Sequence, residues 1–151
     1  MKKKIIVLGA GLVGKAMAVD LAKNFDVSSA DINEEALASA SKSKIDTIKL
    51  DFNDGDAVSQ TLKNFDLVVG AVPGFMGFEI ARQVIEAGKN MVDISFFPED
   101  PFLLDDLAKK NGVTIVTDCG VAPGMGNIIL GYHSQLMKLA VTRCLVEGLA
   151  V

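Results

Sequence analysis

The chain has 151 residues, half of them hydrophobic, and a formal net charge of −4. This length suits a single domain with its own packed core, and the acidic balance argues against a nucleic-acid-binding surface, because the only basic cluster is the short run at residues 2–4. No apolar run approaches the roughly 20 residues of a membrane span. Two cysteines, Cys119 and Cys144, suggest no disulfide framework. We therefore expect a cytoplasmic protein that binds neither nucleic acid nor membrane.

Strand-like and helix-like segments alternate along the whole chain. Short apolar, β-branched runs predict strands, and apolar residues at four-residue spacing predict helices. The expected strands are residues 5–8, 26–31, 45–50, 66–72, 91–94 and 113–116, with a seventh at 141–146. The expected helices are residues 11–24, a segment after Asn33, a segment after Asn53 or Asp54, 77–87, 101–111 and 126–139. This alternation predicts a Rossmann-type, doubly wound α/β fold: a mainly parallel sheet of about six strands in a three-layer α/β/α arrangement.

A glycine motif of the form G-x-G-x-x-G follows the first expected strand and opens the first expected helix. Its residues are Gly9, Ala10, Gly11, Leu12, Val13 and Gly14. Gly9 permits a tight turn, Gly11 lets the backbone approach a pyrophosphate, and Gly14 lets the helix pack closely on the strand. The free amides at the start of the helix then face the diphosphate of a dinucleotide.

Asp31 stands at the end of the second expected strand, twenty residues after Gly11. A carboxylate at this place can accept hydrogen bonds from the adenosine ribose hydroxyls, and it would repel the extra phosphate of NADP. The following residues, from Ile32 to Glu34, include no Arg or Lys to bind that phosphate. We therefore predict NAD as the cofactor, with NADP as the less favoured choice; the alternative is that Asp31 is only a turn residue before a helix.

Two further loops follow strands that lead to the same edge of the predicted sheet. Asp51 and Phe52 come after the third strand and are expected to flank the adenine, although a plain helix-capping role suits them equally. Ala71, Val72 and Pro73 come after the fourth strand, at the carboxyl edge where ligands bind in doubly wound folds. We expect the ribose and the nicotinamide to lie along this loop.

Asp93 and Asp118 end the fifth and sixth expected strands and are the candidate acid/base residues. Each could instead cap a loop. Residues 120–126 form a tight, glycine-rich turn with free amides at a helix start, which can hold a carboxylate or the amide of the cofactor. No metal site is expected, because His133 is the only histidine.

Three segments together resemble a known family. The glycine motif at residues 9–14, Met-Val-Asp-Ile-Ser at 91–95 and Asp-Cys-Gly-Val-Ala-Pro-Gly at 118–124 look like those of the saccharopine dehydrogenase-like oxidoreductases, nearest to their L-lysine 6-dehydrogenase branch. The resemblance covers nearly the whole chain, and its Val-Ala-Pro-Gly segment is more specific than the glycines. It implies NAD(P)-dependent oxidation at a carbon–nitrogen bond of an amino acid: an amine becomes an imine, and hydride passes to the nicotinamide.

The resemblance also implies a second domain, which binds the amino-acid substrate and builds a dimer. We expect residues 1–140 to be the NAD(P)-binding domain and residues 141–151 to begin that second domain, so that the chain alone is inactive. An open strand edge near the C-terminus predicts a homodimer or a higher assembly.

Two other functions remain open at this point. A non-catalytic NAD-sensing module of the kind that gates potassium transport has the same length, glycine motif and acidic residue. Such a module does not need the Ala-Pro-Gly loop within residues 118–127, so this loop favours the dehydrogenase interpretation. A remnant that binds NAD and does nothing else is the third possibility.

Overall fold

Six parallel strands form one sheet in the order β3-β2-β1-β4-β5-β6, and the computed structural model describes residues 2–143. The strands are β1 (Lys4–Leu8), β2 (Asp26–Asp31), β3 (Asp46–Lys49), β4 (Leu67–Gly70), β5 (Met91–Asp93) and β6 (Ile115–Val116). Ile6 in β1 lies opposite Ser28 of β2 and Val68 of β4. The strand order therefore reverses between β1 and β4, which is the switch point of a doubly wound fold.

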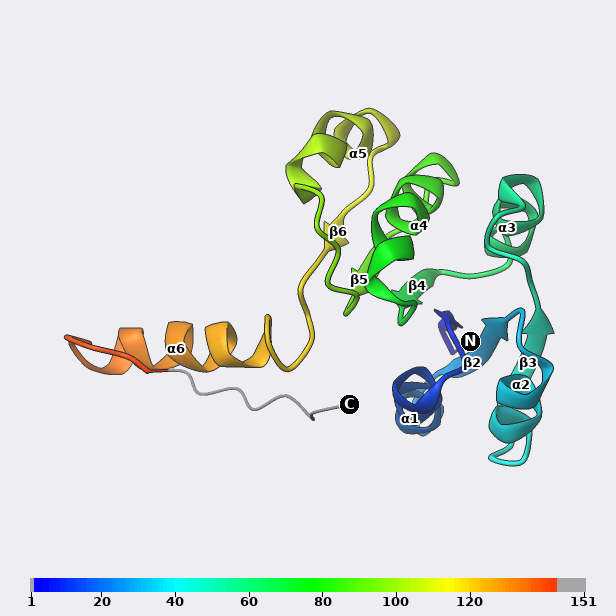
Figure 1. The fold of residues 1–151 in the computed structure, drawn as a ribbon, viewed down its shortest axis with the longest axis horizontal. Coiled ribbons are helices and arrows are strands. Elements are labelled where there is room, and N and C mark those ends of the chain that lie inside the picture. The colour runs from blue at the N-terminus through cyan, green and yellow to red at the C-terminus, as the bar shows by residue number, and fades with distance from the viewer. Residues whose placement is uncertain (1, 144–151) are drawn as a thin grey trace.

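Helices lie on both faces of this sheet. They are α1 (Leu12–Leu21), α2 (Glu34–Ser41), α3 (Gly55–Leu62), α4 (Gly74–Glu86), the 3₁₀ helix η1 (Pro101–Leu104), α5 (Asp105–Asn111) and α6 (Met125–Leu136). One face carries α1 and α2, and the opposite face carries α3, α4 and α5, whereas α6 projects away from the sheet (Figure 1). The predicted Rossmann-type, three-layer α/β/α fold is confirmed.

Polar side chains cap the N-termini of α2 and α3, as the sequence predicted. The Asn33 side chain accepts hydrogen bonds from the backbone N–H groups of Glu35 and Ala36. Asp54 accepts one from Ala57 and so caps α3, which decides between the two candidates Asn53 and Asp54. These bonds satisfy amide groups that have no partner inside the helix.

The central strand is buried on both of its faces. Ile6 and Leu8 pack into a cluster with α3, α4 and α5, whereas Ile5 and Val7 pack into a second cluster beneath α1 and α2. Because strand side chains alternate between the two faces, a continuous apolar run is what such a strand requires. The two clusters hold the glycine loop after β1 on a rigid base.

Several expected boundaries differ from the structure. The helix expected at 77–87 begins at Gly74, because Pro73, with φ −57°, already lies at its N-cap. The helices expected at 11–24 and 126–139 both end earlier, at Leu21 and Leu136. Residues 141–143 form no strand, and the remainder of the expected seventh strand lies outside the described residues. Within residues 2–143, no helix combines the length and the apolar character needed to span a membrane.

Candidate functional site

The loop between β1 and α1 packs directly against the loop after β4. Gly9 has φ +104°, and a Cβ there would lie 2.4 Å from the carbonyl oxygen of Ala71. A Cβ on Gly14 would lie 2.0 Å from the carbonyl oxygen of Gly9. Gly11 differs, because a Cβ there would meet no atom within 4 Å. The fold therefore requires the first and third glycines, whereas the second keeps open the space in front of the loop.

The N-terminus of α1 faces this open space without a side-chain cap. Gly11 is the N-cap residue, and within the described chain no side chain accepts a hydrogen bond from the first turn. Leu12 and Val13 are 87% and 58% exposed. Free amides and the positive end of the helix dipole make this turn able to bind a phosphate group.

Asp31 ties the end of β2 to the glycine loop. Its Oδ2 accepts a hydrogen bond of 2.7 Å from the backbone N–H of Ala10, and its Oδ1 accepts one of 2.9 Å from Asn33. Ala10 is buried, whereas Ile32, the residue after Asp31, is exposed. Sequence reasoning assigned Asp31 to a ligand and missed this bond to the loop. Each carboxylate oxygen can accept more than one hydrogen bond, so both roles are compatible.

The sequence analysis did not include one lysine that lies at this end of the site. Lys49 lies opposite Asp31 in the pairing of β2 with β3, and it forms an exposed ion pair with Glu34. The hydrogen bond and the positive charge of Lys49 lower the pKa of the Glu34 carboxyl. The register between two strands brings Lys49 here, and no local motif signals it.

Asp51 and Phe52 lie in different environments. Asp51 is exposed, and its Oδ1 accepts hydrogen bonds of 2.9 Å from both the backbone N–H and the side-chain amide of Asn53. The Phe52 ring is buried in the core beneath α3 and α4. Its carbonyl oxygen accepts a hydrogen bond of 3.2 Å from Nε2 of Gln83. Of the two side chains, that of Asp51 lies at the surface near the carboxyl edge.

The loop after β4 is held to β1. The backbone N–H of Ala71 donates a hydrogen bond of 2.8 Å to the carbonyl of Leu8. Val72 is buried, and Pro73 is exposed at the N-cap of α4. The residues predicted after β1 and after β4 are thereby brought side by side at the switch point.

Asp93 is fully buried at the end of β5. Its Oδ2 accepts a hydrogen bond from the Ser95 hydroxyl, and its Oδ1 has no hydrogen-bond partner among the described residues. Two glycines make room for this pair: a Cβ on Gly70 would lie 2.0 Å from Oδ1 of Asp93, and one on Gly77 would lie 2.1 Å from the Ser95 hydroxyl. Burial raises the pKa of Asp93 to about 6, against the hydrogen bonds from Ser95, and the charge of Asp118 adds to the rise.

Asp118 lies next to this buried pair, at the end of β6. It has φ +57° and is half-buried. The backbone N–H of Cys119 donates a hydrogen bond of 2.9 Å to the carbonyl of Asp93, which joins the ends of β5 and β6. Burial raises the pKa of the Cys119 thiol, and the carboxylates of Asp93 and Asp118 add to the rise. The two candidate acid/base residues are thus brought together beside a protonated thiol.

A glycine-rich turn connects β6 to α6. The backbone N–H of Met125 donates a hydrogen bond of 2.8 Å to the carbonyl of Gly120. Gly124, with φ +133°, lies against Gly120 so closely that a Cβ would approach that carbonyl oxygen to 2.2 Å. His133 is exposed on α6, with its ring edge-on to Tyr132. Residues 2–143 contain no group of three or more His, Cys, Asp or Glu residues placed to hold a metal ion.

The strand order, the glycine loop at the switch point and the acidic residue at the end of β2 define a Rossmann-type dinucleotide-binding domain. Residues 5–116 match the family model described as the saccharopine dehydrogenase NADP binding domain. The chain belongs to this family.

Two relatives and one solved structure are similar to this chain over most of its length. Saccharopine dehydrogenase [NADP(+), L-glutamate-forming] of Saccharomyces cerevisiae is 27% identical over 133 residues, which are 85% of this chain and 29% of that protein. The mitochondrial alpha-aminoadipic semialdehyde synthase of Mus musculus is 25% identical over 85% of this chain and 14% of its own length. A structure of apo saccharopine dehydrogenase from S. cerevisiae matches with a TM-score of 0.79 and 23% identity, over 89% of this chain and 31% of that one. The chain therefore spans less than a third of these relatives.

Proposed function

We propose that this chain is the cofactor-binding domain of an oxidoreductase that acts on a carbon–nitrogen bond of an amino acid. The observation that carries the proposal is the contrast among the three glycines. Gly9 and Gly14 are closed in by backbone atoms, and Gly11 borders open space in front of free helix amides. A pyrophosphate fits this space, because its charge matches the helix dipole and its bulk needs a residue without a side chain. The names of the relatives support the amino-acid substrate class.

The dinucleotide would lie along the carboxyl ends of the strands, across the switch point. Gly11 and the first turn of α1 would bind the pyrophosphate, and Asp31 would orient the adenosine ribose while it holds the loop through Ala10. The loop from Ala71 to Pro73 would border the ribose and the nicotinamide. When bound, the nicotinamide supplies the hydride acceptor. The protein's contribution is to orient the ring and to exclude water.

We propose a preference for NAD over NADP. Asp31 and Glu34 place two carboxylates at the adenosine end, and Lys49, which lies opposite Asp31, is already paired with Glu34. A phosphate on the ribose would approach Asp31 and meet like charge. The yeast relative and the matched family are described by NADP, so this preference separates the present chain from the relatives it resembles.

The acid/base group of the proposed reaction would be Asp118, with Asp93 behind it. Asp118 is half-buried at the strand edge, whereas Asp93 is fully buried and bonded to Ser95. The Asp93 carboxyl, with a pKa of about 6, holds a proton below about pH 6 and is mostly ionised at pH 7. Asp93 would act as a positioning residue, because its backbone carbonyl accepts the hydrogen bond from Cys119 that ties the Asp118 segment to the end of β5. A lysine 6-dehydrogenase-type oxidation and a cytoplasmic location remain parts of this proposal.

The test is calorimetric titration of the chain with NAD and with NADP. Gly11→Val should abolish NAD binding while the thermal midpoint stays within a few degrees, because its side chain would point into open space rather than into the fold. The matched control is Gly55→Ala, where a Cβ also meets no atom within 4 Å but the position lies at α3, away from the glycine loop. Asp31→Ala should reduce the difference between the dissociation constants for NAD and for NADP. If Gly11→Val binds NAD as tightly as the parent chain, the pyrophosphate does not lie at this loop.

A further inference from the structure

Lys49 brings a basic side chain to the end of the site where the adenosine ribose is proposed to lie. The pairing of β2 with β3 sets Lys49 opposite Asp31, and neighbouring strands lie about 4.8 Å apart. The preceding pair, Ala30 and Ile48, packs into the core on the side of α3 and α4. Because successive side chains of a strand alternate between the two faces, Asp31 and Lys49 both project to the side of α1 and α2.

Glu34 neutralises this lysine. It lies in the first turn of α2, and its carboxylate forms the ion pair with Nζ of Lys49. Asp31 bonds elsewhere, since its two oxygens accept hydrogen bonds from the backbone N–H groups of Ala10 and Asn33. The side chains of Glu34 and Lys49 are 75% and 63% exposed, so both are accessible to a ligand at the carboxyl edge.

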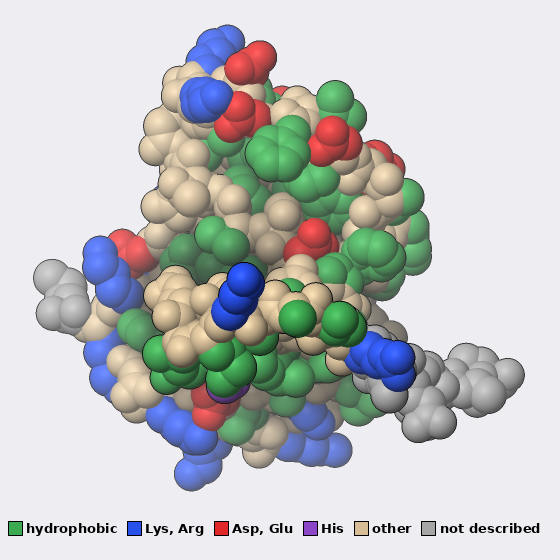
Figure 2. Space-filling model, turned by 90° about the vertical axis from the view of Figure 1, so that its left-hand side faces the viewer, with side chains coloured by type: hydrophobic (Ala, Val, Ile, Leu, Met, Phe, Trp, Pro, Cys, Tyr) green, Lys and Arg blue, Asp and Glu red, His purple; other side chains and the backbone are tan. Residues whose placement is uncertain are grey.

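The sequence around this ion pair supplies acidic residues rather than further cations. Residues 26–41, which include β2 and α2, contain no Lys or Arg, and the first turn of α2 carries Glu34 and Glu35. Lys15 of α1 is directed toward Ser39, to whose hydroxyl it donates a hydrogen bond of 2.9 Å. On the face shown in Figure 2, Lys and Arg side chains lie mostly along the rim, with Asp and Glu side chains among them, and the chain has a net charge of −4. A phosphate at the adenosine end therefore depends on Lys49 for attraction.

We propose that Glu34 is a specificity-determining residue, because its ion pair withholds Lys49 from the 2′-phosphate of NADP. This inference rests on the proposed dinucleotide site. In dinucleotide-binding domains of this fold, an acidic residue in the place of Asp31 binds the ribose 2′-hydroxyl, and a basic residue nearby accommodates the 2′-phosphate of NADP. Lys49 has a flexible stem, so its Nζ can turn from Glu34 toward a phosphate beside Asp31 once Glu34 releases it.

The ion pair acts differently on the two cofactors. NAD has only hydroxyl groups on its adenosine ribose, so its binding leaves the pair between Glu34 and Lys49 intact. The 2′-phosphate of NADP adds a charge of about −1.5 to −2 at neutral pH. It meets the carboxylates of Asp31 and Glu34, and Lys49 binds it only when the pair with Glu34 breaks. Glu34→Gln removes one of these negative charges and frees Lys49, and it leaves the hydrogen bond from Ala10 to Asp31 in place.

The experiment is calorimetric titration of the parent chain, Glu34→Gln, Lys49→Gln and the double variant with NAD and with NADP, at about 0.1 M salt. In Glu34→Gln, the ratio of the Kd for NADP to the Kd for NAD should fall by at least about fivefold, and added salt should reduce this gain. Lys49→Gln should raise the ratio about threefold more in the Glu34→Gln chain than in the parent chain. This coupling distinguishes the release of Lys49 from the loss of a negative charge alone, which would act equally with and without the lysine.

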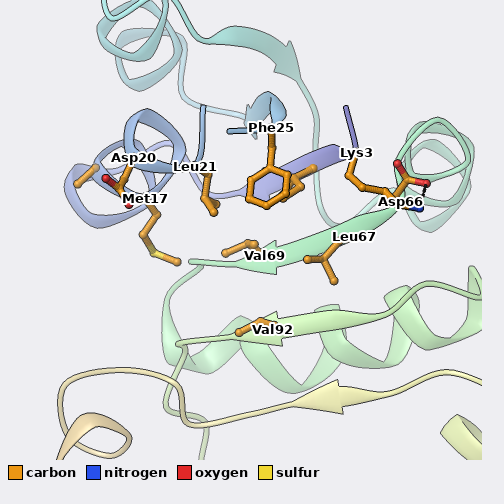
Figure 3. A pocket seen from close by; sticks show the side chains of 11 residues that line it. Lys3, Met17, Asp20, Leu21, Phe25, Asp66, Leu67, Val69 and Val92 are labelled. Atoms are coloured by element: carbon orange, nitrogen blue, oxygen red, sulfur yellow. Dashed lines mark ion pairs between the residues drawn. The ribbon is translucent and has the colours of Figure 1, made fainter. Parts of the chain in front are cut away.

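Asp66→Asn is the matched control. Asp66 forms an exposed ion pair with Lys3, which Figure 3 marks with a dashed line. These two residues precede β4 and β1, at the ends of the strands opposite to the glycine loop. The variant removes the same charge as Glu34→Gln and also frees a lysine. Because the five residues of β1 span about 16 Å and the Debye length at 0.1 M salt is about 10 Å, the ratio should stay within about twofold of the parent value.

The outcomes for this inference and for the proposed function are distinguishable. A parent chain that binds neither cofactor contradicts both. If the parent chain binds NAD but the ratio is unchanged in Glu34→Gln, or if Lys49→Gln acts equally in both backgrounds, the role of Glu34 alone is overturned. This role is also overturned if the parent chain binds NADP more tightly than NAD, because Lys49 is then not withheld. A shift in Asp66→Asn as large as that in Glu34→Gln has the same consequence.

Discussion

Helices α4 and α6 both start at a Pro-Gly dipeptide, Pro73-Gly74 and Pro123-Gly124, and have 13 and 12 residues. Five residues of α4 are buried, whereas none of α6 is. Ile80 in α4 is 1% exposed, whereas Ile128 in α6 is 66% exposed. The first helix crosses back over the sheet and packs beside α3 and α5, and the second leaves the sheet edge (Figure 1). The comparison shows that an apolar stripe indicates that a helix packs against another surface, but it does not indicate which surface.

The largest effect expected from this contrast is on stability. Ile80→Ala should lower the free energy of unfolding by about 2–5 kcal/mol, because it leaves a cavity in the core under α4. Ile128→Ala should change it by less than about 0.5 kcal/mol in the dilute, monomeric protein. Urea unfolding followed by circular dichroism measures both values. Equal losses in the two variants would show that α6 is packed as tightly as α4.

The buried carboxyl beneath the first turns of α4 makes stability depend on pH. The pKa of Asp93 is raised from 3.8 to about 6, so the folded chain binds a proton there more tightly than the unfolded chain does. Its contribution to stability is therefore full below pH 4 and is lost as the pH rises through about 6. The difference between the two pKa values corresponds to about 3 kcal/mol as an upper value.

Asp93→Asn removes this titration. Comparing the parent chain with this variant therefore separates the contribution of Asp93 from those of the other carboxyl groups. The parent-minus-variant difference in unfolding free energy should fall between pH 4 and pH 7, as measured by urea unfolding at each pH. Hydrogen bonds from Lys4 and Arg82 lower the pKa values of Asp66 and Glu79, respectively. These two carboxyl groups therefore lose stabilisation as the pH falls, and their effect is the same in both chains and cancels in the difference. A difference that does not vary with pH would contradict the raised pKa of Asp93.

One glycine in each of the two helices tests the same difference in packing between α4 and α6. In α4, a Cβ on Gly77 would lie 2.1 Å from the Ser95 hydroxyl and 2.6 Å from the Phe97 ring, so Gly77→Ala should cost about 1–3 kcal/mol. In α6, a Cβ on Gly131 meets no atom within 4 Å, so Gly131→Ala should favour the helix by up to about 1 kcal/mol. Thermal unfolding of the two variants should shift in opposite directions. Shifts in the same direction would count against the packing described for one of the helices.

The smallest effect concerns the charged surface of α4, which α6 lacks. Arg82 forms ion pairs with Glu79 and Glu86, all three of them partly exposed. Arg82→Ala should cost less than about 1 kcal/mol, and salt should reduce the difference further, because exposed pairs are screened. Urea unfolding at low and high salt measures this. A larger loss that salt does not change would indicate that Arg82 contributes through packing instead.

The fold and the glycine loop could be predicted because each depends on local chemistry. The run from Ile5 to Leu8 has to be buried on both faces, and Asn33 satisfies the amides of its own helix. Gly9 and Gly14 take part in a turn whose geometry is known from spacing alone. The catalytic candidates were harder to assess, since burial separates Asp93 from Asp118 and strand ends alone do not reveal burial.

Sequence pattern alone was sufficient for the α/β alternation, the glycine motif and the acidic residue at the end of β2, because hydrophobic period, turn chemistry and helix caps act over a few residues. Tertiary structure was needed for the bond from Asp31 to Ala10, the position of Lys49 beside Asp31 and the raised pKa of Asp93. Each of these features depends on strand register or on burial by distant elements, and neither quantity can be computed from a local window of residues.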